Sequence, residues 1–463
     1  MMIDDEHPKA YQQRVLRIAS ILLMLFSPIW ILLMFYTPEF ELGAGIVLLP
    51  FLAVLTVVAA YQLARRDQFE RKTLLAGATF KLLCCGMYNG MVFFIYSGGT
   101  DSVTYFRTGI DWAANFGMLG VGAIRVPYWG TPFVTMLAGI LIYFVPSDAF
   151  IAGTFALVGF WGQYLFYRAF SIAFPEGDRR DMGLLVFLIP SLGFWSASVG
   201  KEAICILGIG LCAYGYARAS GQANPTGYLI AGVGLAVTGL VRPHIGAMVA
   251  LALALAISFS STKKGVLGIL NKFVGIPLIF VGTIYIVTRA QAFVNAGDFS
   301  SGVSSIQSTQ HLSSVGGSGF GGSLISRILF APFILFRPFP WEVRSLIMVA
   351  ASLEGALFGI FFWLRRRNLW YAVQHWRHPF ILFIFAFSIQ FVVIFSAAIS
   401  NFGILTRERV MLIPLAIMLT CLPRARRRKA IGVSAAGRYH PFGFSTVAGT
   451  SPAGEPPVPV SRI

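Results

Sequence analysis

Apolar runs of about 20 residues recur along the chain, and short stretches rich in Gly, Pro, Arg or Lys separate them. A helix of that length crosses the ~30 Å hydrocarbon core of a membrane and satisfies its own backbone hydrogen bonds. The pattern therefore predicts an all-α fold, a polytopic transmembrane bundle of about 12 helices. We expect these helices near 17–36, 43–63, 74–97, 149–172, 182–199, 203–219, 226–241, 244–261, 265–288, 344–363, 379–399 and 408–422.

Two further apolar runs do not fit this scheme. The run TPFVTMLAGILIYFVPS (131–147) is bounded by Pro127 and Pro146, and counting it as a crossing would invert the orientation of every later segment. The run LISRILFAPFILFRPFPW (324–341) is interrupted by Pro332. We expect both runs to form juxtamembrane or re-entrant helices on the outer face.

Composition excludes a soluble domain. The 463-residue chain is 56% hydrophobic and 12% charged, whereas soluble domains carry about 25% charged residues. All five cysteines fall inside apolar runs without metal-binding spacing, so we expect core residues rather than disulfides or ligands. The net charge of +17 would indicate nucleic acid only in a soluble chain, because basic residues of a membrane protein mark its cytoplasmic loops.

Clusters of Lys and Arg set the expected orientation. They lie at 65–72, 179–180, 263–264, 365–367 and 424–429. With the predicted crossings all of them face the cytoplasm, and so do both termini. The first apolar run is too long for a cleavable signal peptide, and no small-residue cleavage site follows it. The sequence thus predicts a multi-pass protein of the cell (inner) membrane.

Composition also divides the chain into four parts. We expect a cytoplasmic N-terminal tail at 1–16, an N-terminal transmembrane hairpin at 17–73, a transmembrane domain at 74–423 and a disordered, basic cytoplasmic tail at 424–463. Within the third part we expect an outer loop at 98–148 and a flexible outer loop at 289–326, where 298–323 is rich in Ser and Gly.

Cations on the predicted outer face are unexpected, since Lys and Arg normally avoid that side. Arg107 and Arg125 lie in the outer loop, and the others stand at helix ends: Lys201, Arg242, His244, Arg407 and Arg409. Such side chains can neutralise a phosphate or pyrophosphate, so we interpret the set as an anion site. The alternative is snorkelling, or local pairing of Lys201 with Glu202 and of Arg407 or Arg409 with Glu408.

The stretch GGTDSVTYFRTGIDW (98–112) follows the third predicted helix. Asp101 lies just past the membrane, Tyr105 follows one helical turn later, and Arg107 and Asp111 are also spaced i,i+4. A carboxylate there can take a proton from an acceptor hydroxyl as a general base. It can also hold a divalent cation, although a single Asp is a poor metal site and the sequence makes no cofactor certain. The alternative is a helix cap, because GGTDS is a good capping sequence.

Three charged residues inside apolar runs need a separate interpretation. Lys81 and Lys272 lie within a few turns of the predicted cytoplasmic face, so we expect them to snorkel toward it. Glu354 lies midway along a predicted helix without an obvious partner. It is either core-facing and neutral or functional, and the sequence leaves both open.

These residues resemble the pattern of the GT-C superfamily, the integral-membrane glycosyltransferases that use polyprenyl-phosphate sugars. The shared features are an Asp in the first large outer loop with a Tyr one turn later, a juxtamembrane GTPFVTMLAGILIYF, and a break at Pro146-Ser147 before an inward helix. The stretches PSLGFWSASVGKEA, VRPH, RPFPWE and NFGILTRERVMLIP are similar to motifs of bacterial membrane proteins encoded with exopolysaccharide and O-antigen genes. The resemblance covers residues 74–422.

The chain also departs from that pattern. GT-C proteins usually place the acidic loop after the first helix, often with two adjacent acidic residues. Here two predicted helices precede the loop, and Ser102 follows Asp101. The hairpin at 17–63 would be an N-terminal addition, and Asp111 or Glu202 are alternatives to Asp101.

The resemblance implies a GT-C-like glycosyltransferase, of hexosyltransferase or polymerase type, that acts at the outer face during cell-surface polysaccharide synthesis. Asp101 would activate the acceptor hydroxyl. The implied partners are a saccharide on a polyprenyl-(pyro)phosphate carrier, a saccharide acceptor, membrane lipids and polysaccharide-assembly proteins, with no nucleic acid. The implied substrate and phosphate contacts are Tyr105, Arg107, Lys201, Glu202, Arg242, His244, Arg407 and Arg409.

Other functions remain alternatives: a polymerase of whole repeat units, a transporter or flippase of lipid-linked saccharide, and a non-catalytic subunit of a polysaccharide assembly machine. A transporter is expected to show internal repeats and ionisable groups at the bilayer midplane. The ionisable groups here lie at the predicted outer face, which favours an enzyme.

Overall fold

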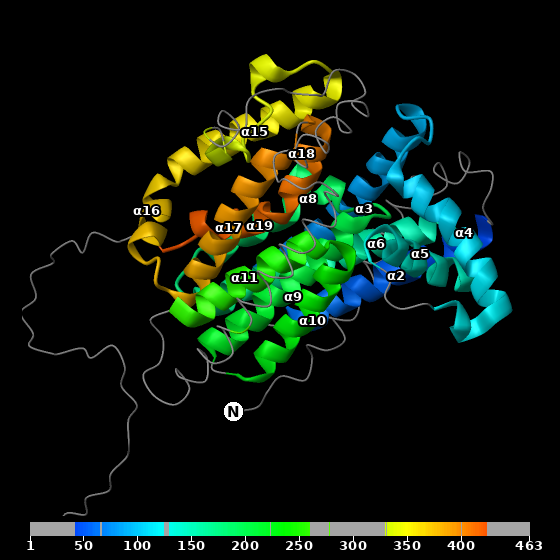
Figure 1. Cartoon of the computed structure of the whole chain (residues 1–463), viewed down its shortest axis with the longest axis horizontal. Helices are drawn as coiled ribbons and strands as arrows, with labels where there is room; N and C mark the ends of the chain where they lie inside the picture. The colour runs from blue at the N-terminus through cyan, green and yellow to red at the C-terminus, as the bar shows by residue number, and fades with distance from the viewer. Residues whose placement is uncertain are drawn as a thin grey trace, which may run out of the picture. The chain divides into compact units, whose positions relative to one another are not determined.

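The computed structural model describes residues 42–64, 67–124, 129–222, 224–259, 331–399 and 401–423, with single positions at 277 and 329. Over these residues the chain is helical and forms no strand (Figure 1). The all-α prediction is confirmed for this part of the chain. The helices expected at 17–36 and 265–288, the Ser/Gly-rich loop, the basic tail, Arg125 and Lys272 lie outside the described residues.

The described elements follow one another with short connections. They are α2 Leu42–Leu63, α3 Gln68–Phe94, α4 Asp101–Leu119, η1 Gly120–Ala123, α5 Thr131–Phe144, α6 Asp148–Ala173, α7 Arg179–Leu188, α8 Pro190–Trp195, α9 Lys201–Gly221, α10 Thr226–Val241, α11 Pro243–Phe259, η3 Ala331–Phe333, η4 Pro340–Glu342, α15 Leu346–Leu364, α16 Arg366–Gln374, α17 Pro379–Ala398, α18 Phe402–Glu408, η5 Arg409–Met411 and α19 Ile413–Thr420.

Most predicted helices are present within two residues of their expected bounds, namely α2, α6, α9, α10, α11, α15 and α17. The helix α5 also forms where the juxtamembrane or re-entrant helix was expected. From residue 331 onward, the second such run forms the short 3-10 turns η3 and η4 instead of a helix.

Two predicted helices are broken, so the expectation of continuous helices there is wrong. The first, at 182–199, divides into α7 and α8 because Pro190 has no N–H and pushes Ile189 to an extended conformation (φ −65°, ψ 124°). The second, at 408–422, begins with the 3-10 turn η5, and Pro414 opens α19 after it. At the first break the Ser191 backbone donates to Glu354, and the second break directly follows Glu408.

The contacts between helix ends show which segments share an end of the bundle. At one end Arg365 pairs with Asp181, and Asn368 Nδ2 donates to Thr420 O at 2.8 Å. These residues belong to the end of α15, the start of α7, the start of α16 and the end of α19. The opposite end carries the starts of α4 and α9 and the end of α10. We call this second end the network end, after the charged network described below.

Glycines let the central helices approach each other closely. A Cβ added at Gly162 of α6 would lie 2.6 Å from the backbone carbon of Ile206 in α9, and one at Gly234 of α10 would lie 2.6 Å from the Cys212 nitrogen of α9. Small residues at such crossings are typical of packed membrane helices. Figure 1 shows α9 and α10 side by side. This packing fixes α9, which carries two charged site residues at its start.

Three helices are long and apolar enough to cross a membrane: α6, α9 and α17. The segment Met348–Leu364 together with Arg366–Gln374 would make a fourth span, bent by 63° at the junction of α15 and α16. This count covers the described residues alone. It supports association with a membrane, and the larger number of crossings remains a prediction. The five cysteines are all buried and free, as expected of core residues.

Candidate functional site

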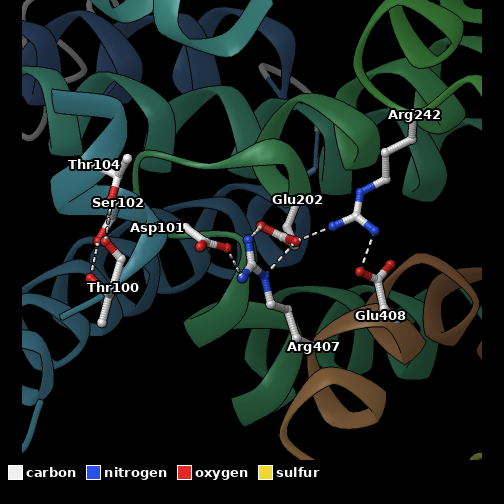
Figure 2. Close-up of polar contacts among 8 residues, drawn as sticks. All are labelled: Thr100, Asp101, Ser102, Thr104, Glu202, Arg242, Arg407 and Glu408. Atoms are coloured by element: carbon white, nitrogen blue, oxygen red, sulfur yellow. Dashed lines mark hydrogen bonds and ion pairs between the residues drawn. The ribbon is translucent and has the colours of Figure 1, made fainter. Parts of the chain in front are cut away.

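A chain of five charged side chains crosses the network end (Figure 2). Arg407 donates from Nη1 to Asp101 Oδ2 at 2.7 Å, and from Nε and Nη2 to the two oxygens of Glu202 at 2.6 and 3.0 Å. Arg242 Nη2 donates to Glu202 Oε1 at 2.5 Å, and its Nη1 donates to Glu408. We call these five residues the charged network. It brings together residues up to 307 positions apart in the chain, which is the separation of Asp101 and Glu408.

Helix ends position the members of the network. Asp101 and Glu202 lie in the first turns of α4 and α9, where the helix dipole favours negative charge. Arg407 lies in the last turn of α18, where the dipole favours positive charge. Asn401 starts α18 by accepting hydrogen bonds from the backbone of Gly403 and Ile404. The helix dipole therefore supports Asp101, Glu202 and Arg407, whereas Glu408, in the last turn of α18, depends on its ion pair with Arg242.

Exposure rises from Glu202 through Arg407 to Asp101. The Glu202 side chain is 2% exposed, that of Arg407 is 23% exposed and that of Asp101 is 60% exposed. Burial alone would lower the pKa of Arg407, but the Glu202 and Asp101 carboxylates outweigh it and raise the pKa well above its ordinary value. Arg407 is thus a permanent cation that joins a buried carboxylate to an exposed one.

The network has an imbalance of charge that Lys201 offsets. Three carboxylates face two guanidinium groups, so the network carries one net negative charge. Lys201, the first residue of α9, lies within electrostatic range of Asp101, Arg242 and Arg407. Its side chain makes no hydrogen bond or ion pair with the described residues. Lys201 was expected to bind phosphate. Its ammonium group is not paired with a carboxylate of the described residues, so it remains available to do so.

The alternative that these charges pair with their neighbours in the sequence is wrong. Glu202 binds Arg242 and Arg407 rather than Lys201, and Glu408 binds Arg242 rather than Arg407 or Arg409. The capping alternative for Asp101 is also wrong. Thr100 occupies the cap position of α4 without a side-chain cap bond, and Asp101 is the first helical residue.

Arg409 belongs to a second, separate cluster. It is fully buried, its Nη1 donates to Leu335 O and Arg337 O at 3.2 and 2.7 Å, and its Nη2 donates to Glu354 at 2.8 Å. Glu354 also accepts a hydrogen bond from the Ser191 backbone at 2.8 Å. Glu354 therefore faces the core. It joins α15 to η5 through its ion pair with Arg409 and to α8 through the Ser191 backbone.

The remaining candidates make no hydrogen bond or ion pair with the five residues of the charged network, although Tyr105 and His244 lie within electrostatic range of it. Tyr105 is buried, and burial, followed by the nearby Asp101 carboxylate, raises its pKa to about 12. Arg107 and Asp111 are exposed on α4, and neither makes an ion pair with a described residue. His244 is exposed, and its ring centroid lies 6.2 Å from that of Phe395.

Lys81 does not snorkel, contrary to expectation. It is 1% exposed, and its Nζ donates to Leu192 O at 3.2 Å and to Ser196 Oγ at 2.5 Å. These acceptors belong to α8 and the loop that follows it, which leads to Lys201 and Glu202. Lys81 therefore ties α3 to the segment that presents the network, and sequence reasoning missed this role.

Among the residues that the structure describes, no three His, Cys, Asp or Glu side chains are arranged to hold a metal ion. Comparison with known proteins finds no matching family model, no matching curated protein and no matching solved structure.

Proposed function

We propose that this protein is a membrane glycosyltransferase that passes a saccharide from a polyprenyl-(pyro)phosphate carrier to an acceptor hydroxyl at the outer face of the bacterial inner membrane. One observation carries the proposal most strongly. Asp101 is an exposed carboxylate, and the guanidinium group that holds it is itself fixed by the buried Glu202. An exposed carboxylate held in place by a neighbouring residue that is itself fixed is typical of a catalytic site.

One oxygen of the Asp101 carboxylate is open, which supports the role of general base that we assign to it. Its Oδ2 accepts the bond from Arg407, while Oδ1 accepts no hydrogen bond from the described residues and is open to an acceptor hydroxyl. The hydroxyl proton moves to Asp101 as the hydroxyl oxygen attacks the anomeric carbon. The bond from that carbon to the carrier oxygen breaks, and its electron pair leaves with the phosphate. Attack from the opposite side would invert the configuration.

Lys201 is the group that we assign to the leaving phosphate. Its ammonium group is not paired with a described carboxylate, and it stands at the start of α9, which no side chain caps. At this helix start the Glu202 carboxylate already accepts a hydrogen bond from its own backbone N–H, so we assign the phosphate to the charge of the Lys201 ammonium group. Stabilising the charge that develops on the phosphate is often the largest contribution to catalysis.

Arg242 and Arg409 have structural roles in this proposal. Arg242 is neutralised by Glu202 and Glu408, and Arg409 is fully buried against Glu354 and two carbonyl groups. Neither presents a free donor to a substrate at the surface. Of the cations expected to contact phosphate, Arg242 and Arg409 are thus not assigned to it; Lys201 is, and Arg407 positions Asp101.

A deletion strain tests the proposed class of function. Carrier-linked saccharides are extracted and identified by mass spectrometry, with and without the wild-type chain. We expect the deletion to accumulate a carrier-linked saccharide that external enzymes or periodate can reach in spheroplasts. Accumulation of a protected saccharide on the inner side would instead support the transporter. No accumulation on either side would contradict both.

A further inference from the structure

An apolar groove lies along α15, separate from the charged network. Its volume is about 470 Å³. One wall is formed by the segment around Phe336 and Phe339, and the other by Gly355, Gly359 and Trp363 of α15. Phe336 O packs onto Gly355, where an added Cβ would lie at 2.3 Å, whereas a Cβ at Gly359 would meet its nearest atom only at 3.9 Å. The groove is therefore closed near Gly355 and deeper near Gly359.

A single charged residue, Arg366, stands at one end of this groove. It is the first residue of α16, directly after the 63° bend. Its Nη1 donates to the Trp363 carbonyl at 3.1 Å, its guanidinium carbon lies 5.0 Å from the Trp363 ring centroid, and it makes no ion pair with a described residue. Its neighbour Arg365 is instead bound to Asp181. Arg366 thus offers an unneutralised positive charge at the mouth of an apolar channel.

The dimensions and the aromatic residues suit a lipid. From Gly355 to Leu364, where α15 ends, the helix rises by about 14 Å, which is close to the thickness of one leaflet of a ~30 Å hydrocarbon core. Trp363 and Trp370 are 68% and 62% exposed on either side of the bend. Tryptophan prefers the boundary between hydrocarbon and head groups. The bend therefore lies where a phosphate head group would be found.

We propose that this groove binds an acyl chain of an anionic glycerophospholipid, whose phosphate contacts Arg366. The apolar walls fit the chain, and the free guanidinium group favours an anionic head group over a neutral one. The polyprenyl carrier is a poorer occupant. Arg366 follows Arg365, which pairs with Asp181 at the end of the bundle opposite the network. A carrier with its phosphate at Lys201 would leave Arg366 without a counter-charge.

Native mass spectrometry of the full-length protein in detergent tests this site. Phosphatidylglycerol and phosphatidylcholine with identical acyl chains are titrated separately. We expect phosphatidylglycerol to bind about fivefold more tightly, as one interfacial arginine would provide. Arg366→Gln should remove this preference, whereas Arg367→Gln, an exposed neighbour outside the groove, should keep it. Gly359→Leu should weaken both lipids, because the side chain fills the groove.

Equal affinity for the two lipids, or an equal loss in the two arginine variants, would overturn the proposal. Thermal unfolding checks that each variant is folded. If Gly359→Leu does not fold, cross-linking of the wild-type protein replaces it. A phosphatidylglycerol with a photoreactive acyl chain should label 333–340 or 355–369, and labelling confined to other segments contradicts the site.

Discussion

Arg407 holds Asp101 and Glu202 at the same time, through separate nitrogens of one guanidinium group. The bidentate contact to Glu202 fixes the plane of the guanidinium group. Asp101 then receives its bond from a donor that has little freedom to move. The exposed carboxylate is consequently positioned by an arginine that a buried carboxylate, Glu202, holds in place.

Removing the charge of Glu202 should destabilise the fold strongly. In Glu202→Gln, Arg242 and Arg407 lose their shared carboxylate while both remain largely buried. Breaking a buried ion pair from one side costs about 3–5 kcal/mol. We expect a loss of that size in the free energy of unfolding, measured by denaturant titration in detergent. Glu176→Gln, at an exposed site, is the control, and an equal, small effect of the two substitutions would argue against a buried network.

The pair of Arg409 and Glu354 should behave as one unit. Arg409→Met alone leaves Glu354 without its cation, and Glu354→Met alone leaves the buried Arg409 charge uncompensated. Each single change should cost about 3–5 kcal/mol, and the double substitution should cost less than the sum of the two. A double-mutant cycle of unfolding free energies measures the coupling. Additive effects would show that the pair contributes nothing beyond its separate side chains.

Lys81→Met should loosen the segment that leads to the network. The change keeps most of the volume but removes the donor to Leu192 O and Ser196 Oγ, at a cost of about 1–3 kcal/mol. Cys84, which lies against α8 at Gly193, should become more reactive toward maleimide. Mass spectrometry of labelled peptides measures this. Lys72→Met is the exposed control on the same helix, and unchanged Cys84 labelling would show that Lys81 does not hold α8.

Close helix packing makes a further prediction. Gly162→Ala places a methyl group 2.6 Å from the Ile206 backbone carbon, which cannot give way as a side chain can. We expect a destabilisation of about 1–3 kcal/mol from overpacking. Gly232→Ala in α10 meets no atom within 4 Å and should instead stabilise by about 0.5–1 kcal/mol, because it restricts the unfolded chain. Thermal unfolding of the two variants measures both effects. Unfolding temperatures that shift in the same direction would contradict this prediction.

Helix positions could be predicted from the sequence because apolar run length alone constrains a helix. The bounds of α10 agree with the prediction at both ends. The broken segments could not be predicted in this way, because hydropathy averages over a proline. Pro190 interrupts an apolar run without lowering its mean hydropathy enough to end it.

The members of the site could be predicted in part. Asp101, Glu202, Arg242 and Arg407 were candidates from the sequence because charges at the ends of apolar runs are costly without a purpose. Their partners could not be found, since the sequence offers local pairs such as Lys201 with Glu202 and only folding brings Arg242 to Glu408. Arg409 and Glu354 carried one usable signal, because two opposite charges inside apolar runs favour a buried pair.

The role of Asp101 as a base is the central claim, and one comparison tests it most directly. A deletion strain is complemented with Asp101→Asn or with Asp111→Asn, an exposed carboxylate on the same helix that makes no ion pair with the described residues. Expression levels are matched, and carrier-linked saccharide is measured by mass spectrometry. Our account predicts that Asp111→Asn clears the accumulated saccharide as the wild type does, while Asp101→Asn leaves it in place. Clearance by Asp101→Asn at the wild-type level would contradict the account.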